Sequence, residues 1–115
     1  MNKHLQERIE AILARYNTVT LATGGQAGPQ ISDVSYQAKH LRLYLFIPRS
    51  SDHLFNLETQ PEVALLTPAW RLHGRMVATD NTVAPHDWQR AVLVEPIRLH
   101  ILSEDGQNTL ETIDF

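Results

Sequence analysis

The sequence lacks cysteine, which excludes disulfides, thiolate metal sites and cysteine nucleophiles. It also lacks any apolar run near the ~18 residues that a membrane-spanning helix requires. The N-terminal segment has no apolar stretch of the kind that a secretory signal needs. Basic residues are not in excess: 13 acidic and 10 basic residues give a net charge of −3, so no basic field indicates nucleic acid. These absences predict a cytoplasmic protein with neither a membrane nor a nucleic acid partner.

Recognisable metal and catalytic motifs are missing as well. The six histidines show no HxH, HxxxH or HExxH spacing, so we expect no metal site. The glycine-rich segment 24–28 precedes a strand and is not followed by Lys-Ser/Thr, which predicts a hairpin turn and not a phosphate loop. A hydrolase triad drawn from Ser51, His53 and Asp33 lacks the G-x-S-x-G elbow that would support it.

The sequence does contain a strand–loop–helix–strand unit over residues 41–66. Apolar and polar residues alternate from Leu41 to Ile47, which indicates a strand, and Pro48 ends it because proline cannot donate to a ladder. Arg49–Asp52 then supplies a cation, two hydroxyls and a candidate N-cap, and the short helix that follows ends before Pro61. A helix start with backbone N–H groups, hydroxyls and a cation suits an anion.

The rest of the chain predicts one mainly β (α+β) domain that spans residues 1–115. A helical periodicity covers residues 5–16. Strand patterns cover residues 18–23, 30–36, 70–79, 97–101 and 108–115, with turns at 37–40 and 104–107 and a short helical turn at 86–90. Six or seven short strands joined by tight turns predict an antiparallel sheet that closes into a barrel or a split barrel.

Two strands carry patterns that suggest a ligand. Strand 30–36 has no cleanly apolar face, which fits either an edge strand open to water or a strand that lines a polar ligand. Strand 70–79 places Arg71, His73 and Arg75 on one face. Such a stripe is either a solvated face or a cationic wall against an anionic ligand held by a second subunit.

The order of these motifs resembles the FMN-binding split-barrel family related to pyridoxamine 5′-phosphate oxidase. In that family a strand of the type LYxF runs into a loop of the type TxxxSxK and then a helix reading xxNLxxNPxVAL. Here Tyr44–Phe46 matches the strand, Arg49–Ser51 the loop, Asn56–Leu57 the helix and Gln60–Leu65 its exit. One departure is His53, which stands where the family's loop commonly has lysine.

The resemblance covers roughly residues 5–80 and implies an antiparallel split β-barrel with an N-terminal helix and a short helix between strands. It further implies a homodimer with FMN bound in each of two clefts between the subunits. In the family, the strand that corresponds to residues 30–36 runs beside the flavin ring. The cofactor-binding residues that we predict are Ser32, Asp33, Val34, Ser35, Phe46, Ile47, Arg49, Ser50, Ser51, His53, Trp70 and Trp88.

These side chains have separate predicted roles. Arg49 would supply a constant charge on the phosphate, Ser51 a hydroxyl donor and His53 a pH-dependent cation. Because a phosphate dianion favours the imidazolium, we expect the pKa of His53 to rise in the complex. Trp70 or Trp88 would stack on the flavin as an aromatic slab.

The predicted function is that of a small FMN-dependent oxidoreductase of unknown substrate, with the chemistry supplied by the flavin. No catalytic acid or base can be assigned. Pyridoxamine phosphate is not the expected substrate, because the W-x-x-x-R-L-x-P signature of those oxidases is absent after Trp88. The alternatives with the same fold are a non-catalytic flavin or haem binder, an F420-dependent reductase, and an interaction module without a cofactor.

Overall fold

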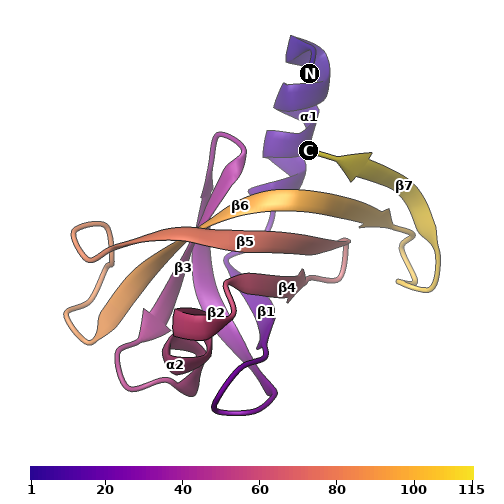
Figure 1. Cartoon of the computed structure of the whole chain (residues 1–115). Coiled ribbons are helices and arrows are strands. Elements are labelled where there is room, and N and C mark those ends of the chain that lie inside the picture. The colour runs from indigo at the N-terminus through magenta and orange to yellow at the C-terminus, as the bar shows by residue number, and fades with distance from the viewer.

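The computed structural model describes all 115 residues, which form seven strands and two helices. In chain order the elements are α1 (Lys3–Leu13), β1 (Thr18–Thr23), β2 (Gln30–Lys39), β3 (Arg42–Pro48), α2 (Asp52–Thr59), β4 (Glu62–Leu66), β5 (Trp70–Asp80), β6 (Gln89–Leu102) and β7 (Thr109–Asp114). The strands curl around one interior, with α1 at one end of the barrel and α2 near the other (Figure 1). Neither helix has the length and apolar character needed to cross a membrane.

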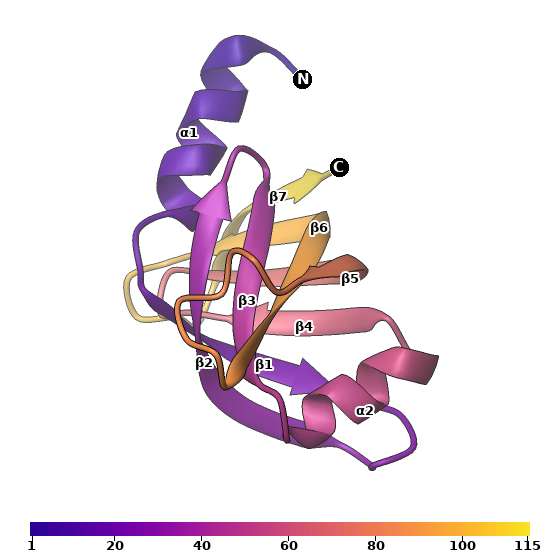
Figure 2. The same ribbon diagram turned by 90° about the vertical axis from the view of Figure 1, so that its left-hand side faces the viewer.

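Six of the strands close into a barrel. The strand order is β3-β2-β1-β4-β5-β6, and β6 returns to pair with β3. The seventh strand, β7, pairs only with the second half of β6, where β6 has already left β3. Figure 2 shows α1 and the C-terminus at the same end of this barrel, and Arg8 of α1 forms an ion pair with Glu111 of β7. The predicted antiparallel split barrel with two helices is confirmed.

The longest strand, β6, corrects two predictions. It runs without a break from Gln89, whereas the sequence suggested a helical turn at 86–90, either more of that turn or the start of a strand at 91–94, and a separate strand from 97. Pro96 does not end the strand because it lies at a bulge, where the register with β5 shifts between His73 and Gly74. Proline is tolerated at a bulge, since the ladder there already omits a hydrogen bond.

Two other boundaries differ from the sequence prediction. β2 continues to Lys39, so the predicted turn at 37–40 is confined to the end of that range, where His40 adopts a left-handed φ of 55°. Helix α1 ends at Leu13 and not at Tyr16. The hydroxyl of Tyr36 donates to the Leu13 carbonyl, which supplies a partner for one of the unpaired carbonyls at the end of the helix.

Alternating apolar residues from every barrel strand fill the interior. Leu43, Leu45 and Ile47 of β3 and Trp70 and Leu72 of β5 are all buried, as the alternation in these two strands requires of one face. At Gly74 the strands approach so closely that an added Cβ would lie 2.6 Å from Cγ1 of Val94. A small barrel is packed with side chains in this way, so a ligand site has to lie outside it or at its ends.

Candidate functional site

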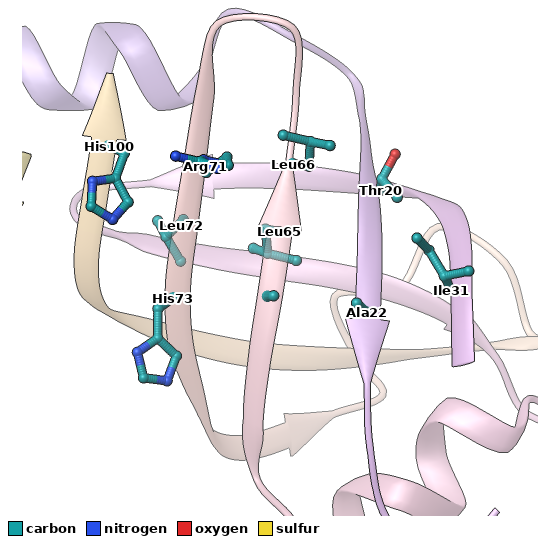
Figure 3. A pocket seen from close by; sticks show the side chains of 10 residues that line it. Thr20, Ala22, Ile31, Leu65, Leu66, Arg71, Leu72, His73 and His100 are labelled. Carbon is teal, nitrogen blue, oxygen red and sulfur yellow. The ribbon is translucent and has the colours of Figure 1, made fainter. Parts of the chain in front are cut away.

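A groove of about 490 Å³ crosses the outer wall of the barrel, and we call it the outer groove. It is lined by Thr20, Ala22, Ile31, Ala64, Leu65, Leu66, Arg71, Leu72, His73 and His100 (Figure 3). These residues come from β1, β2, β4, β5 and β6. The volume falls within the usual range for a small-molecule site, which is about 300–1,000 Å³.

The strand register explains why the groove is hollow at its centre. Ala22 of β1 lies opposite Ile31 of β2 on one side and Ala64 of β4 on the other. Ala64 in turn lies opposite His73 of β5. Because opposite residues share a face of a sheet, two methyl side chains form the floor and larger side chains stand around them. A floor of this kind lets a flat ring approach the sheet closely.

The two sides of the groove differ in charge. On the β5–β6 side, Arg71 lies opposite His100, and His73 follows Arg71 on the same face. On the β2 side, the carboxylate of Asp33 accepts a hydrogen bond of 2.7 Å from the hydroxyl of Thr20. Arg71 therefore gives the β5–β6 side of the outer groove a positive charge, and the Asp33 carboxylate lies beside the groove on its β2 side.

Arg49 links the end of β3 to the loop between β5 and β6. Its backbone N–H donates to the carbonyl of Trp88 at 2.9 Å, and its Nε donates to the carbonyl of Asp87 at 2.7 Å. Ser50 beside it is exposed. Ser51 is the N-cap of α2, and its hydroxyl accepts from the backbone N–H of His53 at 3.1 Å. Part of the predicted phosphate loop thus already serves the fold.

His53 occupies an environment that differs from the one predicted. Its side chain is buried, with Nδ1 2.7 Å from the Thr23 hydroxyl and Nε2 2.8 Å from the Ser32 hydroxyl. Burial lowers the pKa of His53, and the nearby Asp52 opposes that shift only in part. In this structure His53 is therefore a neutral ring with both nitrogens engaged, and the pH-dependent cation expected at this position is not available to a ligand.

Asn56 is a residue whose role the sequence did not reveal, although it belongs to the Asn-Leu motif. Its side chain is fully buried and accepts from the backbone N–H of Ala27 at 2.8 Å. Its Nδ2 donates to the carbonyl of Gly28 and to the hydroxyl of Thr23. At Gly25, where φ is 147°, an added Cβ would lie 2.9 Å from the Asn56 backbone. These contacts hold α2 against the β1–β2 hairpin.

The two tryptophans lie in opposite environments. Trp70 is fully buried and meets Tyr36 edge to face, with ring centroids 6.2 Å apart. The prediction that Trp70 forms a slab for the cofactor is therefore wrong, because the alternation of β5 turns its side chain into the barrel. Trp88 is 58% exposed and stacks on His86, with ring centroids 5.4 Å apart. A contact between Trp88 and a cofactor stays a prediction.

The other predicted site residues fall into two groups, those that point into the core and those on the outer face of their strand. Val34 and Ile47 point into the core, so only their backbone groups remain for a ligand. Phe46 is 7% exposed and lies outside the core cluster, opposite the exposed Ser35. Asp33 borders the outer groove through Thr20. The predicted set is thus spread over the β2–β3 wall and the start of α2, next to the groove and not within it.

Protonation of His53 is expected to destabilise the fold. Its pKa is lowered in the folded chain, so between that value and the ordinary value near ~6.5 the unfolded chain binds more protons. The stability that His53 contributes is present above pH ~6.5 and is lost as the pH falls from there through the lowered pKa. The limiting slope for one proton is about 1.4 kcal/mol per pH unit. Urea unfolding at half-unit steps from pH 8 to pH 4 measures it.

The matched control for this prediction is His53→Gln, which keeps a hydrogen-bonding side chain of similar reach without a titratable ring. The variant should lose the part of the acid-side slope that begins near pH 6.5. Identical slopes in the wild type and the variant would mean that His53 has the same pKa in the folded and the unfolded chain.

The chain is similar to known proteins in its three-dimensional structure, and no match is found at the level of sequence. No protein-family model matches the chain, and no curated protein matches its sequence. General stress protein 26 from Bacillus anthracis superposes with a TM-score of 0.74 and 18% identity, over 97% of this chain and 99% of that one. A putative pyridoxamine 5′-phosphate oxidase from Listeria innocua gives a TM-score of 0.68 and 16% identity, over 85% and 98%.

A third match is a haem binding protein from Mycobacterium smegmatis, with a TM-score of 0.67 and 15% identity over 99% of this chain and 59% of that one. At sequence identities this low, the superpositions establish a shared fold and nothing more. The chain has the split-barrel fold of proteins that resemble pyridoxamine 5′-phosphate oxidase. Because such folds carry several functions, the ligand has to be argued from the site.

Proposed function

We propose that this chain is an FMN-binding flavoprotein that works as a homodimer and acts as an oxidoreductase on a small molecule. The observation that carries the proposal is the outer groove, with its floor of Ala22 and Ala64. A flavin is a flat ring with an apolar edge, a polar edge and an anionic tail. The low floor suits the flat ring, and the apolar side chains around it suit the apolar edge. The charged side chains on and beside the groove suit the polar edge and the anionic tail.

The fit of the ring rests on named contacts. Ile31 and Leu66 stand at the rim as exposed apolar side chains, 73% and 44% accessible, and provide surface for the dimethylbenzene edge. The Asp33 carboxylate is an acceptor for the N3–H of the pyrimidine edge. The guanidinium of Arg71 on the β5–β6 side matches the negative tail.

The proposal of a dimer follows from the openness of the groove. One chain covers only one face of a flat ring, which would leave the other face in water. Exposed Ile31 and Leu66 beside the groove would be buried if a second copy of the chain packed on this wall. A twofold pair would then enclose two cofactors in two equivalent clefts.

The chemistry would be divided between cofactor and chain. A bound flavin supplies hydride or electron transfer at its ring. The chain binds the ring, orients it through Asp33 and, as a dimer, excludes water from the cleft. The titratable groups that line the groove, His73 and His100, are candidates to move a proton, but no contact places either one on a reacting atom.

Freshly purified protein is expected to show the absorption bands of bound flavin and to sediment at micromolar concentration as about twice 13.1 kDa. Apoprotein titrated with FMN should quench flavin fluorescence with one FMN per chain, because the ring becomes stacked and shielded in the cleft. Absorption spectroscopy, sedimentation velocity and fluorescence titration measure the three results.

Each alternative has its own signature in the same experiment. A Soret band would indicate haem, and the spectrum of a deazaflavin would indicate F420. Failure of the apoprotein to bind FMN, together with a colourless preparation, would contradict the proposal. A clean monomer that binds FMN tightly would contradict the cleft between two chains.

A further inference from the structure

We infer that Ser32 donates its hydroxyl hydrogen to an acceptor oxygen of the bound flavin, and that His53 is the positioning residue that keeps this hydrogen available. The inference rests on the proposed function and goes beyond it, because it assigns the direction of one hydrogen bond. The acceptor is an oxygen of the ring or of the phosphate, which the experiment below distinguishes. The inference is carried by a chain of hydrogen bonds from Asn56 through Thr23 and His53 to Ser32.

The chain of hydrogen bonds begins at Asn56, whose amide fits its surroundings in one orientation. Its Oδ1 accepts from the backbone N–H of Ala27 at 2.8 Å, and its Nδ2 donates to the carbonyl of Gly28 at 2.8 Å. A backbone N–H only donates and a carbonyl only accepts, so the reversed amide would face donor with donor and acceptor with acceptor. Nδ2 also lies 3.1 Å from Oγ1 of Thr23. The hydroxyl of Thr23 therefore accepts from Asn56.

Thr23 passes this direction on to His53. The Thr23 side chain is buried, and its hydroxyl has two partners, Nδ2 of Asn56 and Nδ1 of His53. Since the amide nitrogen is a donor, the hydroxyl hydrogen of Thr23 has Nδ1 as its acceptor, at 2.7 Å. A hydrogen on Nδ1 would leave the Thr23 hydroxyl hydrogen buried without a partner, which is unfavourable. The neutral ring of His53 thus carries its hydrogen on Nε2.

The chain ends at Ser32, on the surface. Nε2 of His53 lies 2.8 Å from Oγ of Ser32, so with this tautomer the Ser32 oxygen accepts from the ring. Its own hydrogen then has no partner within the chain of bonds, and Ser32 is exposed. The opposite tautomer would take that hydrogen for Nε2 and leave Ser32 only as an acceptor. The buried network therefore makes Ser32 a hydrogen-bond donor to a ligand.

Ser32 lies where a ligand of the outer groove can reach it. It stands on β2 between Ile31, which lines the groove, and Asp33, which lies beside it. The ladder of β2 with β3 begins only at Ser35, so residues 30–34 pair with β1 alone. Figure 2 shows α2 next to this end of β1 and β2. A flavin that lies over the unpaired edge of residues 30–34 can contact both Asp33 on one face and the Ser32 hydroxyl on the other.

The first test measures the tautomer of His53 without a ligand. In protein labelled with ¹⁵N-histidine, the chemical shift of each imidazole nitrogen reports whether that nitrogen carries a hydrogen, and His53→Gln identifies the signals of His53. At pH 8 we expect a hydrogen on Nε2 and none on Nδ1. Thr23→Val keeps the shape of the side chain and removes the hydroxyl, so the hydrogen should become shared between the two nitrogens. A wild-type ring with its hydrogen on Nδ1 would overturn the inference.

The second test is a set of FMN and riboflavin titrations on apoprotein of the wild type, Ser32→Ala, Thr23→Val and the double variant. With a ring oxygen as acceptor, Ser32→Ala should weaken binding of both flavins by about 3- to 10-fold. With a phosphate oxygen as acceptor, it should weaken FMN alone, by about 10- to 100-fold. Thr23→Val should weaken binding less, and should have no further effect once Ser32 is replaced, because it acts through Ser32.

The matched control is Ser103→Ala, which removes a hydroxyl in the turn between β6 and β7 and should bind both flavins like the wild type. Circular dichroism and sedimentation establish that each variant is folded and has the wild-type oligomeric state. Affinities of Ser32→Ala within about twofold of the wild type for both flavins would overturn the contact. An equal effect of Thr23→Val with and without Ser32 would overturn the positioning role, since it would be purely structural. Failure of the wild type to bind either flavin would instead contradict the proposed function, whichever tautomer His53 has.

Discussion

Replacing Ala64 with phenylalanine is expected to abolish FMN binding while the barrel stays folded. Ala64 is exposed on β4 at the centre of the groove floor, opposite Ala22 and His73. Phenylalanine is favoured in strands, so the backbone accepts it, but its ring occupies the space that the flavin needs. We expect the affinity for FMN to fall by at least about 100-fold, which corresponds to about 2.7 kcal/mol.

The control for this variant is Ala11→Phe, which adds the same ring to an exposed position of α1. It should bind FMN like the wild type, because α1 lies at the end of the barrel away from the groove floor (Figure 1). FMN affinity in Ala64→Phe within about twofold of the wild type, or about 0.4 kcal/mol, would show that the ring does not lie on this floor. Sedimentation of both variants separates a filled groove from a broken dimer.

Replacing Trp70 with alanine is expected to cost about 3–5 kcal/mol of the free energy of unfolding, the usual range for removing a fully buried aromatic side chain. Trp70 has no exposed surface and is the largest side chain in the core. A domain of this size is typically stable by only about 5–15 kcal/mol, so the variant should show a much lower urea midpoint. Equilibrium urea unfolding followed by far-UV circular dichroism measures the change.

A second substitution, Trp70→Phe, separates the two interpretations of this tryptophan. Phenylalanine keeps an aromatic edge toward Tyr36 and removes a buried Nε1–H that has no hydrogen-bond partner. Its cost should therefore be smaller than that of alanine, and FMN affinity should be unchanged. As a control, Trp88→Ala should change stability by no more than about 0.5 kcal/mol, since Trp88 is mostly exposed. A loss of FMN binding in Trp70→Phe without a loss of stability would restore Trp70 to the cofactor site.

The position of His53 shows where motif reasoning stops being informative. The motif places it where the resembled family commonly has lysine, so the sequence suggested a phosphate contact. In the structure the first turn of α2 rotates this side chain inward, to Thr23 and Ser32. The motif specifies how far His53 lies from the N-cap of α2. Which groups its side chain contacts depends on which face of α2 packs against the barrel.

The antiparallel strands, their alternating faces and the two helices could be read from the sequence alone. Alternation in β3 and β5, the proline that ends β3 and the N-cap of α2 are local features, and each follows from steric and hydrogen-bonding limits on neighbouring residues. The split barrel itself was implied by the resemblance of the motifs to a known family and not by these local features, and the solved structures share that fold.

The position of the outer groove follows from the folded barrel and could not be read from the sequence. Ala22, Ala64, Arg71 and His100 lie on four different strands, and nothing in their local sequence pairs them. The register of β1 with β4, and of β5 with β6, sets them on one outer wall, because opposite residues of paired strands share a face. Register depends on how the whole barrel closes, and a one-residue slip would turn each of these side chains to the other face.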